Sequence, residues 1–334
     1  MACLYVMEYG TKINLGQGTV DIIGKDDSKR MLPIETLESI VIFGNVAMSN
    51  ACMKECLRRG INVTFLSKRG RYFGRLVSTS HGNPERLKNQ IYLNDNTGFT
   101  LEFTKKILKS KIHNQIIVLK RYNRRVNKNL NEELRQLSIS ERKIMVAASI
   151  ESAMGYEGNA ARYYFQALSK LIKPEFQFSG RNRRPPRDAF NAMISLGYTI
   201  VFCEIFAELE NRNINPYIGF MHKLKDNHPA LVSDLLEEWR AVLVDSTVLS
   251  LIQGNEIRID EFQKNEENSG IIMNNSGVKK LVYKLEQKMQ SNMNYLSYLD
   301  HPVSFRRAIW WQVMNLSRCI DNQSLEYYEP IKLR

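Results

Sequence analysis

The chain has 334 residues, of which 43% are hydrophobic and 25% charged, so it can form packed cores and exceeds the usual size of one domain. No apolar run reaches the eighteen or so residues that would indicate a transmembrane helix. The N-terminus lacks the basic start and long apolar centre of a signal peptide. We therefore expect two domains and a cytoplasmic location.

The charge of the chain is strongly positive, because lysine and arginine outnumber the acidic residues by 47 − 35 = 12. Such an excess indicates a polyanionic partner, either nucleic acid or an anionic membrane surface. No amphipathic anchor is evident, which favours nucleic acid, and a merely solvated basic surface is the alternative. The five scattered cysteines indicate buried free thiols rather than disulfides or a zinc site.

Residues 1–78 predict a small β-rich domain with one helix. Short apolar runs bounded by glycine and polar turns predict strands at 4–7, 20–23, 40–43, 61–66 and 72–77. A helix is expected over 49–59, ended by Gly60. The turn residues Ser80-His81-Gly82-Asn83-Pro84 indicate a linker, which we place at 79–90.

Residues 91–334 predict a larger all-α domain, so the expected fold is α+β with two domains. Apolar residues at helical spacing cover 98–122, and Leu130–Ser138 is also expected to be helical. Ser140 is the predicted cap of a helix that runs, with a break near Gly155, to Ile172. Asp188 is the predicted cap of an apolar helix through Glu210. Further helices are expected over 233–252, 278–296 and 302–320, and 255–277 is expected to be irregular or a hairpin.

Acidic residues lie along one side of the predicted helix 233–252. Asp234, Glu237, Glu238 and Asp245 are separated by helical spacings, while leucine, tryptophan and valine form much of the other side. This stripe could supply carboxylates to a site. The alternative is an N-cap followed by a solvated helix face, and the stripe alone favours that alternative.

Glu157 and His222 are further candidates for the same site. Glu157 lies between Gly155 and Gly158 among small and apolar residues, where an unpaired charge would be costly. Its partner could be Arg162, which would be structural, or a metal ion. His222 follows an apolar segment and, taken alone, could equally be a hydrogen-bonded core histidine. One imidazole with carboxylates would suit manganese or magnesium, which assist phosphodiester chemistry.

Basic residues gather in the first helical stretch and in the loop from Gly180 to Arg187. Two prolines stiffen that loop, so its guanidinium groups would lose less entropy on meeting phosphates. Its arginines are candidates for sequence-tolerant, salt-dependent DNA binding: Arg181, Arg183, Arg184 and Arg187. The alternative is pairing with acidic neighbours inside the fold.

Taken together, the motifs in this chain resemble those of the CRISPR-associated endonuclease/integrase family, whose members catalyse spacer acquisition. The resemblance spans nearly the whole chain and rests on the order and spacing of these motifs: Ser80-His81-Gly82-Asn83-Pro84, Lys111-Ile112-His113-Asn114-Gln115, Gly155-Tyr156-Glu157-Gly158, Arg183-Arg184-Pro185-Pro186-Arg187-Asp188, Asn191-Ala192, Ser195-Leu196-Gly197-Tyr198, Gly219-Phe220-Met221-His222 and Asp234-Leu235-Leu236-Glu237-Glu238.

The resemblance implies a metal site. The family's ligands are the glutamate of Gly-x-Glu-Gly, the histidine of Gly-Phe-x-His and an acid of Asp-x-x-Asp/Glu, which correspond here to Glu157, His222 and Glu237. Asp234 is the neighbouring acid, and it could be a direct ligand or a supporting group. The implied ion is Mg²⁺ or Mn²⁺.

The resemblance also implies a function and partners. The implied activity inserts prespacer DNA into a CRISPR array by attack of a DNA 3′-hydroxyl on a phosphodiester, in antiviral defence. The β-rich domain would form a homodimer, and a small second CRISPR-associated subunit would complete a heterohexamer. Arg162, Tyr163, Tyr164 and the arginine loop would position DNA, with a place in the helical core as the alternative for Tyr164. Two alternatives are a non-catalytic DNA-binding scaffold and a hydrolase of small phosphoesters.

Overall fold

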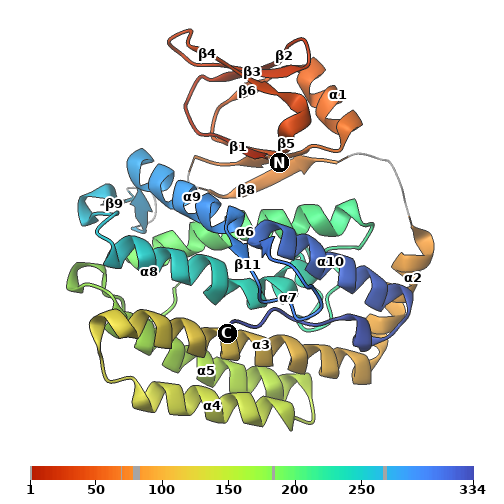
Figure 1. Cartoon of the computed structure of the whole chain (residues 1–334), viewed down its shortest axis with the longest axis vertical. Coiled ribbons are helices and arrows are strands. Elements are labelled where there is room, and N and C mark those ends of the chain that lie inside the picture. The colour runs from red at the N-terminus through yellow and green to blue at the C-terminus, as the bar shows by residue number, and fades with distance from the viewer. Residues whose placement is uncertain (1, 69, 78–82, 183–184, 266–268) are drawn as a thin grey trace. The chain divides into compact units, whose positions relative to one another are not determined.

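The computed structural model describes residues 2–68, 70–77, 83–182, 185–265 and 269–334, and the chain divides into two compact units, Met1–Gly82 and Asn83–Arg334 (Figure 1). Much of the expected linker at 79–90 is helical instead, because α2 (Pro84–Asp95) begins there. The Asn83 side chain accepts a hydrogen bond from the Arg86 N–H, and Pro84 suits the first turn of a helix.

The described residues of the first unit form two four-stranded sheets and one α-helix. One sheet has the order β1-β5-β7-β8, formed by Ala2–Val6, Leu37–Phe43, Asn62–Leu66 and Tyr72–Leu76; its first three strands are parallel and β8 is antiparallel to β7. The other has the order β4-β3-β2-β6, formed by Lys29–Pro33, Thr19–Ile23, Lys12–Leu15 and Ala47–Met48. The predicted β-rich region is thus confirmed.

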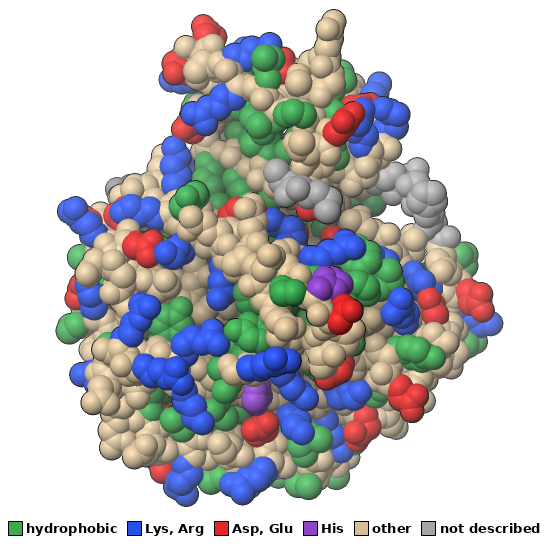
Figure 2. Space-filling view, viewed as in Figure 1, with side chains coloured by type: hydrophobic (Ala, Val, Ile, Leu, Met, Phe, Trp, Pro, Cys, Tyr) green, Lys and Arg blue, Asp and Glu red, His purple; other side chains and the backbone are tan. Residues whose placement is uncertain are grey.

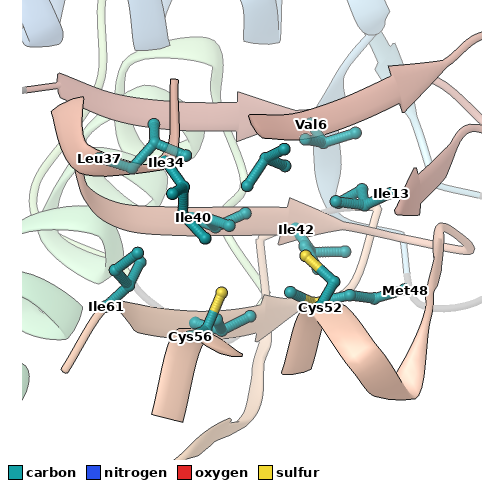
Figure 3. Close-up of a cluster of buried hydrophobic side chains, with 12 residues drawn as sticks. Val6, Ile13, Ile34, Leu37, Ile40, Ile42, Met48, Cys52, Cys56 and Ile61 are labelled. Atoms are coloured by element: carbon teal, nitrogen blue, oxygen red, sulfur yellow. The ribbon is translucent and has the colours of Figure 1, made fainter. Parts of the chain in front are cut away.

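Helix α1 (Asn50–Arg59) belongs to the first unit and has the predicted ends. Ser49 caps its first turn by accepting the N–H of Cys52, and Gly60 ends it with a φ of 70°, a left-handed conformation that glycine adopts readily. Cys52 and Cys56 face inward and are buried with apolar residues of both sheets, including Ile13 and Ile40 (Figure 3). These thiols are free, as expected.

The second unit is mostly helical. Its helices are α2, α3 (Thr97–Val126), α4 (Asn131–Met145), α5 (Ile150–Leu171), α6 (Ala189–Asn211), α7 (Ala230–Trp239), α8 (Ser246–Gln253), α9 (Asn275–Gln290) and α10 (Phe305–Asp321). The described residues also form two small antiparallel sheets, so the expectation of an all-α domain was wrong in this respect, although the first sheet is the hairpin that was one of the two expectations for 255–277. The two sheets pair β9 (Phe262–Lys264) with β10 (Ile271–Met273), and β11 (Asn292–Met293) with β12 (Val303–Ser304).

The helix expected to begin at Ser140 is two helices. Helix α4 continues through Ser140 to Met145, and α5 begins after Ser149, which forms a reciprocal capping box with Ser152. The expected break near Gly155 is absent from α5. Glycine costs a helix roughly 1 kcal/mol relative to alanine, which packing of α5 against α3 and α4 outweighs.

Helices α3, α5, α6 and α7 form the centre of the second unit. Helix α3 packs against both α5 and α7, and α6 packs against the other side of α7 (Figure 1). Helix α6 is long enough and apolar enough to cross a membrane. However, 72% of its most apolar stretch is buried inside the protein. Such burial is typical of a core helix.

Candidate metal and phosphodiester site

Three helices of the second unit bring together two of the expected acids and a lysine. Lys111 on α3 contacts Glu157 Oε1 on α5, and its Nζ lies 2.7 Å from Glu237 Oε2 on α7. Lys111 and Glu237 are buried, with 8% and 6% of their surface exposed. The partner of Glu157 is therefore Lys111 and not Arg162, the structural alternative considered from the sequence.

His222 is held by Asp234 at the N-terminal end of α7. Asp234 is fully buried and accepts hydrogen bonds from the backbone N–H groups of Phe220 (2.7 Å), Met221 (3.0 Å) and His222 (3.0 Å). Its Oδ1 also lies 2.7 Å from His222 Nδ1. The contact fixes the imidazole and leaves Nε2 as the ring nitrogen that can bind a ligand.

The turn before His222 requires a glycine at position 219. A Cβ added to Gly219 would lie 2.7 Å from Asp234 Oδ2 and 2.9 Å from the Ala230 carbonyl carbon, distances that real side chains do not tolerate. The turn formed by the Gly-Phe-x-His motif therefore packs closely against the Asp234 carboxylate.

The charges around Glu237 keep it ionised. Burial acts to raise the pKa of Glu237, but Arg240, with its Nε 3.0 Å from Oε1, and Lys111 together hold that pKa well below its usual value. Burial likewise opposes the charge of Lys111, but Glu157 and Glu237 outweigh it and raise the pKa of the ammonium group. Lys111, Glu157, Glu237 and Arg240 therefore form a largely buried network of ion pairs, which we call the charge cluster.

A cavity of about 160 Å³ opens onto this network. Its walls include every member of the charge cluster together with His222, two tyrosines and a second arginine: Lys111, Gln115, Glu157, Tyr164, Arg181, Tyr198, His222, Glu237, Arg240 and Asp245. Glu157, His222 and Glu237 thus share one cavity. Asp234 is not among its lining residues, since its side chain lies behind His222.

The expected stripe of acids on the helix 233–252 is buried rather than solvated. Asp234, Glu237, Glu238 and Asp245 are exposed by 0%, 6%, 0% and 1%. The solvated-face alternative was therefore wrong. The helix also departs from the regular geometry expected, because residues Arg240–Asp245 form a π-helical segment between α7 and α8. Such segments are frequent at functional sites.

The π-helical segment brings Asp245 to two tyrosines. Tyr164 was expected either to position DNA or to be a core residue, and Tyr198 had no expected role. Asp245 accepts hydrogen bonds from Tyr164 (2.8 Å) and Tyr198 (2.5 Å), and burial raises its pKa to about 6. The Arg240 guanidinium lies over the Tyr198 ring, 4.5 Å from its centroid. The sequence signal for this cluster was the Ser-x-Gly-Tyr motif, which the residue assignments left without a role.

Residues 328–333 pack against α7 at Glu238, the residue that follows Glu237. Glu238 accepts hydrogen bonds from the Tyr328 hydroxyl and from the Ile331 N–H (3.0 Å), and burial raises its pKa to about 7. Side chains of α3 contact backbone oxygens of the same segment: Lys106, Ser110, His113 and Asn114. The two neighbouring acids Glu237 and Glu238 therefore face different surroundings.

The expected DNA-binding arginines have different environments. Arg181 is partly buried, donates to Asn191 Oδ1 (2.8 Å) and Ser195 Oγ (3.0 Å), and lines the cavity. Arg187 is exposed; Arg162 is exposed and lies over the Tyr163 ring, 4.8 Å from its centroid. Arg183 and Arg184 lie outside the described residues. Lysine and arginine side chains are spread over much of the visible face (Figure 2).

The donor types at the cavity fit a hard divalent cation, but a lysine occupies the point where the acids converge. Among the described residues, no group of three or more His, Cys, Asp and Glu side chains is arranged to hold a metal ion. Glu237 Oε2 is buried, and its contact with Lys111 lacks hydrogen-bond geometry, which leaves this oxygen with no hydrogen-bond partner in the described part of the chain. Two carboxylates and an imidazole nitrogen are ligands that Mg²⁺ and Mn²⁺ accept.

Comparison with known proteins places the chain in a family. CRISPR-associated endonuclease Cas1 from Mycobacterium tuberculosis (strain CDC 1551 / Oshkosh) is 32% identical over 321 residues, covering 96% of this chain and 94% of its own length. A solved casposase bound to integration product shares the fold, with a TM-score of 0.86, 19% identity, and coverage of 97% and 92%. A chain of a Cas6-RT-Cas1–Cas2 complex has a TM-score of 0.83 and 25% identity, and matches all of this chain and 36% of its own. The family model described as CRISPR associated protein Cas1 matches residues 4–287, and the chain therefore belongs to the Cas1 family.

Proposed function

We propose that this Cas1 protein is a divalent-metal-dependent DNA endonuclease and integrase that joins a DNA 3′-hydroxyl to a phosphodiester in a CRISPR array. The observation that carries the proposal is the shared cavity, in which Glu157 and Glu237 converge on one cationic group beside His222. The name of the M. tuberculosis relative and the integration product bound by the casposase support this choice of chemistry.

The residues that would hold the ion are Glu157, Glu237 and His222 through Nε2. A bound Mg²⁺ or Mn²⁺ would lower the pKa of the attacking hydroxyl and neutralise charge on the phosphoryl oxygens. Asp234 supports this arrangement indirectly, because its hydrogen bonds within the described part of the chain go to Phe220, Met221 and His222. We therefore propose Asp234 as the group that orients His222 rather than as a ligand.

The remaining cavity groups act on the substrate. Arg240 and Arg181 line the cavity and place fixed positive charge where a phosphate would enter. A Cβ at Gly155 or Gly158 would meet nothing within 4 Å, so packing does not require these glycines, and they leave the approach to Glu157 open. Exposed Arg162 and Arg187, together with Tyr163, are proposed to position the DNA strand, and Arg183 and Arg184 are proposed for the same role from the sequence alone.

The wider assembly is proposed from the relatives and the charge. The excess of twelve positive charges fits prespacer and repeat DNA. The Cas6-RT-Cas1–Cas2 complex contains a Cas1 region matched by this chain, which supports a small Cas2-type partner here. We propose a homodimer formed through the β-rich unit, a heterohexamer with that partner, and action in the cytoplasm.

One assay tests the proposed function. The purified protein is incubated with labelled branched and linear duplexes, in Mn²⁺ and in EDTA, and strand-transfer and cleavage products are separated by size. We expect products in the wild type with Mn²⁺, and none from Glu157→Ala or His222→Ala, although both variants should still bind DNA. Full activity of both variants with metal would exclude the proposed site.

The same assay separates the scaffold alternative. A non-catalytic DNA-binding protein would bind the duplexes in a salt-sensitive manner, unaffected by EDTA, and yield no product under any condition. The binding measurement is made on the same samples, so lack of product is not mistaken for misfolding.

A further inference from the structure

Lys111 occupies the centre of the proposed metal site. Its ammonium group touches one carboxylate from α5 and another from α7, and only 8% of the residue is exposed. A lysine ammonium is a compact point charge on a flexible stem, so it can neutralise two acids and can also move away from them. These contacts are those that a divalent ion would need to replace.

The lysine and a divalent ion cannot share the same carboxylate oxygens. Magnesium binds oxygen at roughly 2.0–2.1 Å, and the positive charges of ion and ammonium would repel each other at such range. An ion that binds Glu157 and Glu237 must therefore move the ammonium group elsewhere.

A receiving group lies four residues along the same helix. Gln115 is only 3% exposed and lines the same cavity, and its buried Oε1 has no hydrogen-bond partner among the described residues. Residues four apart on a helix lie on the same face, within reach of a long side chain. An unpartnered buried acceptor is costly, and a donated N–H from Lys111 would remove that cost.

We propose that Lys111 is the resident cation of the metal-free site, and that a divalent ion binds by displacing its ammonium group from Glu157 and Glu237 to Gln115. This inference rests on the metal dependence of the proposed function. It gives both ends of the Lys111-Ile112-His113-Asn114-Gln115 motif a role at the cavity, while His113 and Asn114 hold residues 331–333. Lys111 acts on the ligands and not on the reacting atoms, so it is a positioning residue.

The test compares metal-free stability with metal affinity. Melting temperature in EDTA and Mn²⁺ affinity by isothermal titration calorimetry are measured for the full chain and for Lys111→Met. Without the ammonium group the two acids repel each other in the absence of metal, so the melting temperature in EDTA should fall by about 5 °C or more. Mn²⁺ no longer competes with a resident cation, so it should bind about 10-fold tighter and restore the lost stability.

A matched control and a second variant make the test specific. Lys105→Met makes the same chemical change on α3, where Lys105 pairs with exposed Glu102, and should leave both measurements unchanged. Gln115→Leu removes the receiving oxygen, so it should weaken Mn²⁺ binding several-fold without lowering the melting temperature in EDTA. If Lys111→Met does not fold, Lys111→Gln is measured in its place.

The outcomes distinguish this inference from the proposed function. If the wild type binds Mn²⁺ and Lys111→Met binds it equally or more weakly, the displacement is wrong while the metal site stands. If neither protein binds Mn²⁺, the metal dependence of the proposed function and the displacement fail together. Tighter binding by Lys111→Met without a loss of stability in EDTA would also overturn the role of Lys111 as a resident cation.

Discussion

The two sides of helix α7 carry neighbouring buried acids with opposite behaviour. Glu237 faces Lys111 and Arg240, whose charges hold its pKa below the usual value against the effect of burial. Glu238 faces Tyr328 and the Ile331 N–H, and burial raises its pKa to about 7, since its hydrogen-bond partners among the described residues are all uncharged. Burial alone therefore does not determine whether a carboxyl group is ionised. On the side of α7 with cations, Lys111 and Arg240 keep the Glu237 carboxylate charged. On the other side, the Glu238 carboxyl group binds the Ile331 backbone.

The largest expected effect is the loss of activity on the cationic side. Glu237→Ala removes a proposed ligand and leaves Lys111 and Arg240 with one fewer acid, so strand transfer should fall below detection in the duplex assay. The matched change on the other side, Glu238→Ala, should retain measurable joining at a temperature where it is folded. Equal loss of activity in both folded variants would contradict the division between the two sides.

Next in size is the loss of stability on the structural side. Glu238→Ala leaves the Ile331 N–H and the Tyr328 hydroxyl without their partner, at about 1–3 kcal/mol for each unsatisfied group. The free energy of unfolding should therefore fall by several kcal/mol in denaturant titrations made in EDTA. Glu102→Ala changes an exposed acid on α3 and serves as the control, with an expected change within about 0.5 kcal/mol.

The pH dependence of stability sharpens the comparison further. With a folded pKa of about 7 against 4.5, Glu238 is protonated in the folded protein over a range where the unfolded chain releases that proton. Stability should therefore fall as pH rises from 4.5 through 7, by about 3 kcal/mol from this residue, and then level off. Asp245, with a pKa raised to about 6, adds a loss of the same sign.

The cationic side of α7 should respond to pH in the opposite direction. The pKa of Glu237 is lowered, so its contribution to stability is present above pH 4.5 and is lost as pH falls below that value.

The variant Glu238→Gln tests the pH dependence assigned to Glu238. It cannot ionise, so it should flatten the decline in stability between pH 5 and 7.5, as measured by urea unfolding in EDTA. An unchanged slope in that variant would mean that Glu238 does not carry a raised pKa.

The smallest expected effect concerns the support of His222. Asp234→Asn removes the charge beside Nδ1 while keeping the side-chain shape, and loss of such a supporting carboxylate typically costs 10–100-fold in metal affinity or activity. We expect a decrease in that range in Mn²⁺ affinity by calorimetry, with DNA binding unchanged. Complete loss of Mn²⁺ binding in a folded variant would instead indicate that Asp234 is a ligand.

Local signals in the sequence predicted much of the fold. The ends of α1 and the start of α6 were predicted because Ser49, Gly60 and Asp188 act through contacts within a few residues. Strands β2, β4 and β6 were missed, since they are short and their apolar pattern is weak: β4 has mostly exposed residues. The start of α5 was misplaced because Ser140 and Ser149 both precede helical patterns, and the local capping box of Ser149 with Ser152 was not recognised in the sequence.

The candidate site was predicted in part. The resemblance supplied Glu157, His222 and Glu237, and the structure brings all three to one cavity. Lys111 was predicted only as one of the basic residues of the first helical stretch and as part of a motif, because nothing local shows that a lysine on α3 reaches acids on α5 and α7. The π-helical segment that aims Asp245 at two tyrosines also depends on long-range packing, and no periodicity in the sequence indicates it.

The position of residues 328–333 in the chain affects the order in which the second unit can fold during translation. Helices α3 and α7 emerge from the ribosome before Tyr328, Ile331 and Leu333, so Glu238 and Asn114 lack the partners that this segment supplies until it has been synthesised. Domains generally fold as units during translation, and this unit lacks the contacts of Tyr328 and Ile331 with Glu238 until that segment has been made. Helix α7 would therefore reach its native surroundings beside Glu237 and Glu238 only after residues 328–333 have been made.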